Sequence, residues 1–171
     1  MQARLNTTKP SQAAIAAYAA AAFFVLAFAR FFILPPEGYG NLLVTLIGVA
    51  PHLLLFPVIA ALPAPPWARA AGFGWLVLDM TTGIMALNGV AAAIFIAMRY
   101  GGHVSAGVWI AAASWQAKGA TRIVGLLTAL DLAGYSFAAP FVPMYVLYPA
   151  ELLLALWLLL IGLRLSARPE G

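Results

Sequence analysis

The stretch PAELLLALWLLLIGLRL, from Pro149 to Leu165, carries only two charged residues, Glu151 and Arg164. A helix that crosses the hydrocarbon core of a bilayer needs about 20 predominantly apolar residues. Extended back to Met144, the stretch reaches this length. It therefore predicts a transmembrane helix.

The rest of the chain has the same character. Of its 171 residues, 64% are apolar and 8% are charged, and the mean hydropathy is +0.97. Soluble domains are about half apolar and about a quarter charged. A small soluble core cannot hide this much apolar surface, so we expect an all-α integral membrane protein whose contact is the lipid bilayer.

Six apolar segments can be recognised, separated by short connections. Short connections favour antiparallel helices that are neighbours in space. We therefore expect a single polytopic domain over residues 1–171, a six-helix transmembrane bundle. The predicted helices are 12–34, 41–62, 72–98, 102–117, 121–139 and 144–165.

Positive charge orients the bundle, because lysine and arginine concentrate on the cytoplasmic side of membrane proteins. With six spans, the inner side holds Arg4, Lys9, Arg69, Lys118, Arg122, Arg164 and Arg168, and the outer side holds Arg30 and Arg99. If the short fourth segment lay on the surface instead, five spans would reverse this bias. Six spans with both termini in the cytoplasm are favoured, and the composition suggests a bacterial cytoplasmic membrane.

Two aspartates interrupt apolar helices at matching positions. RAAGFGWLVLD ends at Asp79 and RIVGLLTALD ends at Asp131, ten and nine residues after an arginine at the inner face. At 1.5 Å per residue, both acids rise to a similar depth. We expect them at the same level of the bilayer. If the two helices touch, at least one acid should be uncharged and hydrogen-bonded to its partner, to Thr128 or to Tyr135, because burial disfavours the charged form.

Other polar residues give weaker signals. His52 follows Pro51 within the second helix, where a broken turn can line a cavity. Glu151 either complements the dipole at the start of the last helix, which we favour, or lies two turns deep. Asn88 lies on the opposite side of the third helix from Asp79. His103 is expected in an outer loop, so no histidine pair and no metal or cofactor site is predicted.

No cysteine is present, and no catalytic or phosphate-binding motif appears. The basic residues lie singly at segment ends, which argues against nucleic acid as a partner. Two hypotheses remain. The first is a non-enzymatic bundle that assembles with other membrane subunits or with itself, or that binds a small ligand. The second is a compact proton- or cation-coupled transporter or channel that uses the intramembrane acids.

Overall fold

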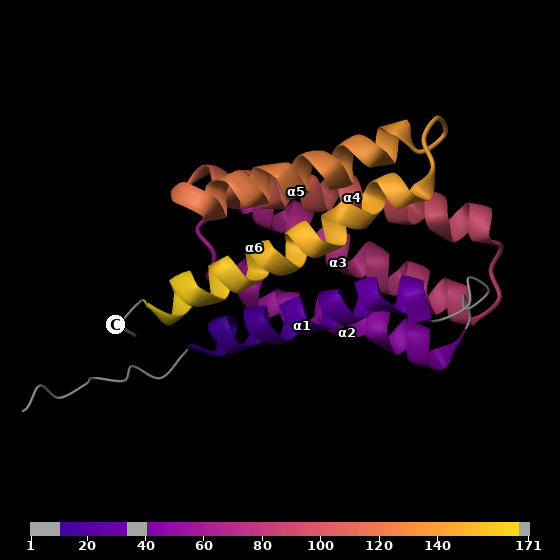
Figure 1. Cartoon of the computed structure of the whole chain (residues 1–171), viewed down its shortest axis with the longest axis horizontal. Coiled ribbons are helices and arrows are strands. Elements are labelled where there is room, and N and C mark those ends of the chain that lie inside the picture. Colours follow the sequence, from indigo (N-terminus) through magenta and orange to yellow (C-terminus); the bar gives the residue numbers. More distant parts are fainter. Residues whose placement is uncertain (1–10, 34–40, 168–171) are drawn as a thin grey trace, which may run out of the picture.

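A computed structural model describes residues 11–33 and 41–167. Within these ranges the chain is helical throughout, without strands (Figure 1). The helices are α1 (Gln12–Ile33), α2 (Leu42–Ala61), α3 (Pro66–Leu87), α4 (Ala92–Trp115), α5 (Gly119–Ala138), the 3-10 helix η1 (Met144–Leu147) and α6 (Tyr148–Ser166). The predicted positions of Arg4, Lys9, Leu34 and Arg168 lie outside the described residues.

The six long helices form a closed ring. Each helix packs against the next one along the chain, and α6 returns to pack against α1. Their axes follow the long dimension of the molecule, and α1 begins at the same end of the ring as α6 ends (Figure 1). We call this the terminal end. The opposite end, where α1, α3 and α5 finish, is called the far end.

Local signals explain where the helices begin. Asn41 caps α2, because its side-chain oxygen accepts a hydrogen bond of 2.8 Å from the backbone N–H of Leu43. Proline stands in the first turn of α3 and of α6, where its missing N–H leaves no hydrogen bond unmade. Helix α2 continues through Pro51 and Pro57.

The predicted boundaries of the third and fourth helices are wrong. The third helix ends at Leu87 rather than at residue 98, and the fourth begins at Ala92 rather than at residue 102. Asn88 and Gly89 form the turn between them, and Gly89 has a φ of 74°. Residues other than glycine rarely adopt this left-handed conformation, so Gly89 fixes the chain reversal. Residues 99–101, which the predicted boundaries leave between these two helices, lie inside α4.

Replacing Gly89 with alanine is expected to lower the free energy of unfolding by about 1–2 kcal/mol, because the new Cβ strains a left-handed backbone. The matched control is Gly74→Ala, since a Cβ on this helical glycine meets nothing within 4 Å. The control is expected to be neutral or slightly stabilising. Unfolding in mixed micelles with increasing dodecyl sulfate measures both changes. Equal stability of the two variants would contradict the conclusion that the turn between α3 and α4 requires glycine at position 89.

Four helical segments are long and apolar enough to cross a membrane: Gln12–Arg30, Leu42–Ala61, Pro66–Leu87 and Met144–Ser166. The outer surface of the ring exposes many large apolar side chains, as lipid contact requires. The fold is thus a helical bundle with the make-up of a multi-pass membrane protein. The six-span count and the orientation stay predictions, because α4 and α5 fall outside this set.

Candidate functional site: a charged cavity inside the helix ring

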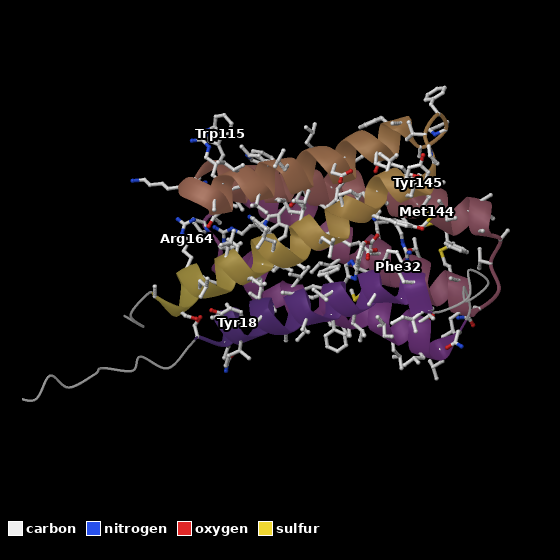
Figure 2. The ribbon with its side chains drawn as sticks, in the orientation of Figure 1. Tyr18, Phe32, Trp115, Met144, Tyr145 and Arg164 are labelled. Atoms are coloured by element: carbon white, nitrogen blue, oxygen red, sulfur yellow. The ribbon has the colours of Figure 1, made fainter. Side chains whose placement is uncertain are left out.

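A cavity of about 120 Å³ lies inside the ring toward its far end. Every long helix and η1 contribute to its wall. Met144 lines it, and Figure 2 shows Met144 at the end opposite to Tyr18, Trp115 and Arg164. Its ionisable lining residues are Arg30, His52, Asp79, Arg99, His103 and Glu151. Two formal positive charges therefore face two formal negative charges, beside two histidines.

Asp79 is the centre of this group. Its side chain is buried, and it lies eight residues before the end of α3, about 12 Å along the helix. Oδ2 accepts a hydrogen bond of 2.8 Å from Nε1 of Trp75 and lies 3.0 Å from Nε2 of His52. The first contact lies within α3, and the contact with His52 ties α3 to α2 at the cavity wall.

Both ring nitrogens of His52 contact oxygen atoms, one in its own helix and one in α3. Its Nδ1 lies 2.6 Å from the carbonyl oxygen of Gly48, which can only accept, so Nδ1 carries a hydrogen. Nε2 then faces Oδ2 of Asp79, and a hydrogen bond there needs a second proton, on the imidazole or on the carboxyl.

Helix α4 brings a second imidazole and a guanidinium group to Asp79. Nε2 of His103 lies 3.8 Å from Oδ2, and Nε of Arg99 lies 4.0 Å from Oδ1. Nε of Arg99 also donates to Oγ1 of Thr82 at 3.0 Å. The close approach of α4 depends on Gly102, since a Cβ there would come within 3.0 Å of Oδ1 of Asp79. The prediction of His103 in an outer loop was wrong, because the turn comes earlier in the chain.

Glu151 and Arg30 complete the charged lining. Glu151 lies in the first turn of α6, as we favoured, yet it also faces the cavity. Its Oε2 is buried without a hydrogen-bond partner among the described residues, and so are Oδ1 of Asp79 and Nδ1 of His103. Buried polar atoms in proteins almost always have partners. The wall of the cavity therefore has both acceptor and donor atoms that could form hydrogen bonds with a polar molecule bound there.

Three tryptophans close the cavity toward the terminal end. The rings of Trp75 and Trp109 lie 6.0 Å apart, and those of Trp109 and Trp157 lie 5.3 Å apart in an edge-to-face arrangement. All three side chains are almost completely buried. Gly72 makes room for this layer, because a Cβ there would come within 2.8 Å of Cγ of Trp109. We call Trp75, Trp109 and Trp157 the tryptophan layer.

Asp79 and Asp131 do not meet, so the condition for their expected pairing is not fulfilled. Helix α4 separates α3 from α5, which make no contact with each other, so similar positions along the two helices do not bring the acids together. Asp131 is half-buried and makes no hydrogen bond or ion pair with any described residue. The order of the helices around the ring, which depth along each helix does not reveal, decides this outcome.

The remaining candidates lie outside the charged group. Thr128 is buried, but its hydroxyl donates to the carbonyl of Val124 in its own helix at 2.8 Å. Tyr135 packs edge-on against Tyr100 of α4 at 5.7 Å. Asn88 is exposed at the end of α3, where its amide donates back to the carbonyl of Ile84. Neither hydroxyl bonds to Asp131, in contrast to our prediction.

The sequence hypothesis missed Trp75, Arg99 and His103. Helical spacing could have found them, because Trp75 and Asp79 are four residues apart and so are Arg99 and His103. Among the described residues, no group of three histidine, cysteine, aspartate or glutamate side chains is placed to hold a metal ion. No family model, curated protein or solved structure matches this chain.

Proposed function

We propose that this chain is a non-enzymatic, six-span protein of a bacterial cytoplasmic membrane that binds a small polar molecule in the cavity between its helices. The observation that carries the proposal is the cavity itself, with its ionisable side chains drawn from five helices. Ionisable residues inside a membrane are costly and are usually retained for function. Both termini are taken to lie in the cytoplasm, so the far end faces outward.

The size and the polar lining of the cavity indicate which kind of small molecule it can bind. One water needs on the order of 10–15 Å³ of such volume, so about 120 Å³ holds several waters or one small molecule. Arg99 can hold an anionic or acceptor group, and Glu151 can accept from a donor group. A molecule with both kinds of group would match the balanced charge of the wall.

A proton-coupled transporter is the second candidate. The contact between His52 and Asp79 favours it, because histidine and buried acids form proton relays in membranes. The tryptophan layer argues against an open pathway, since its packed rings close the cavity toward the terminal end. Binding therefore explains more of the geometry than transport does.

Accessibility of introduced cysteines tests the proposal, because the natural chain has none. Ala27 lines the cavity, and Ala20, seven residues earlier on the same face of α1, is buried and does not line it. In proteoliposomes, a charged methanethiosulfonate reagent should modify Ala27→Cys at least about tenfold faster than Ala20→Cys, because only the first thiol reaches water. Mass spectrometry of the intact protein measures both rates.

The outcomes separate the candidates. Fast modification of Ala27→Cys alone supports a cavity that is open to water on one side. Fast modification of both thiols would favour the transporter, because water would then pass the tryptophan layer. If neither thiol reacts, the charged group is a dry structural cluster and the proposed binding function is wrong.

A further inference from the structure

Asp131 occupies an unusual place on the ring. It lies 12 residues after the start of α5 and seven before its end, so it falls within the middle part of the helix. Helix α5 packs between α4 and α6, and α6 belongs to a candidate membrane span. With the proposed six spans, the outer face of α5 therefore lies at the same level as the lipid-facing surface of α6.

The neighbours of Asp131 on this face are exposed. Leu127, four residues before it, is 49% exposed, and Leu130 is 69% exposed. Gly134, three residues after it, is exposed too, and a Cβ at this glycine would meet nothing within 4 Å. Apolar side chains beside a glycine form a surface on which another membrane helix can approach closely.

The side chain of Asp131 determines which residue such a helix needs in order to bind here. Acids within membrane segments almost always pair with another group, yet Asp131 has no partner among the described residues. Partnered charges of opposite sign give an interface its specificity. A lysine or arginine at matching depth would supply the missing partner.

A second copy of the chain lacks that partner in the part that the structure describes. Arg30 and Arg99 line the cavity, and Arg69 bonds to the carbonyl of Ala64 near the start of α3. Lys118 precedes α5, and Arg164 lies in the last turn of α6. Arg122 stacks on Trp115 in the first turn of α5. None of these cations lies on an exposed face at the depth of Asp131.

We propose that the face of α5 formed by Leu127, Leu130, Asp131 and Gly134 docks a membrane-spanning helix of another protein that carries a lysine or arginine at the depth of Asp131. We call this surface the α5 face. The docking is independent of the ligand cavity, because the α5 face looks outward and Asp131 does not line the cavity. It makes the chain a subunit of a membrane complex.

Synthetic helices of defined sequence test the proposal. Three probes of about 20 leucines differ at the central position, which holds leucine, lysine or glutamate. Fluorescence energy transfer in phosphatidylcholine vesicles measures their association with the full-length protein. We expect the lysine probe to bind at least about tenfold more tightly than the leucine and glutamate probes, because among the three only lysine carries a positive charge that complements a carboxylate.

Variants make the test specific. Asp131→Leu should remove the preference for the lysine probe, and Asp131→Asn should reduce it. Asp79→Asn is the matched control, because Asp79 faces the interior and this variant should keep the preference. Equal binding of all three probes to the natural chain would overturn the proposal. Self-association of the chain that depends on Asp131 and excludes the lysine probe would overturn it in favour of a second copy.

Discussion

Replacing Asp79 with leucine is expected to lower the free energy of unfolding by about 3–5 kcal/mol, because removal of one partner leaves buried charged groups uncompensated. Asp79 is the common neighbour of His52, Arg99 and His103, and Trp75 would lose its hydrogen-bond acceptor as well. Titration with dodecyl sulfate in mixed micelles measures the change. Asp79→Asn keeps an acceptor for the N–H of Trp75, so its free energy of unfolding should fall by less than that of Asp79→Leu.

Asp131→Leu is the matched control for this prediction, since it makes the same substitution at a similar position along a helix. Asp131 has no partner among the described residues, so the free energy of unfolding of the isolated protein should change by no more than about 0.5 kcal/mol. If both substitutions had equal effects, Asp79 would not hold the charged group together. A loss below about 1 kcal/mol for Asp79→Leu would mean that its ion pairs are solvated.

Trp109→Ala is expected to destabilise the bundle by about 3–5 kcal/mol, because the loss of a large packed ring leaves a cavity that the helices cannot close. Trp109 is fully buried between Trp75 and Trp157. The same change removes the middle of the tryptophan layer. The thiol of Ala20→Cys, which we expect to be protected in the single variant, should therefore become accessible to the methanethiosulfonate reagent in the double variant.

Trp115→Ala provides the comparison within the same helix. Trp115 is 65% exposed, and its main contact is a cation–π interaction with Arg122 at 4.5 Å. Such a contact at an exposed site contributes about 0.5–1 kcal/mol, so the variant should lose little stability. Thermal unfolding in detergent and the thiol reaction are the two measurements. An Ala20→Cys thiol that stays protected in the Trp109→Ala background would contradict the role of the layer.

The sequence predicts the class of fold well and the third and fourth helices poorly. Length and hydrophobicity place the first, second, fifth and sixth helices within a few residues of their observed positions, because lipid demands unbroken apolar segments. The turn at Asn88 and Gly89 lies inside a long apolar run, so hydrophobicity does not reveal it. The Asn-Gly pair is itself a turn signal, and it carries more information here than the later Gly101 and Gly102.

The candidate site could be predicted only in part. Asp79, His52 and Glu151 are conspicuous because they interrupt apolar helices, and all three line the cavity. The expected partner of Asp79 was wrong, because the order of helices around a ring depends on packing between small residues. Alanine and glycine recur on almost every helix of this chain, so their spacing does not select the neighbours.

Solid-state nuclear magnetic resonance in lipid vesicles tests the central claim, that Asp79 joins α2 and α4 inside the ring, most directly. The chain has only two histidines and two aspartates, so ¹⁵N labels on histidine and ¹³C labels on the aspartate carboxyl carbons give simple spectra. We predict strong dipolar coupling between the ring nitrogens of His52 and one carboxyl carbon. It should vanish in Asp79→Asn and persist in Asp131→Asn. Absent coupling, or coupling lost only in Asp131→Asn, would contradict the structure of the site.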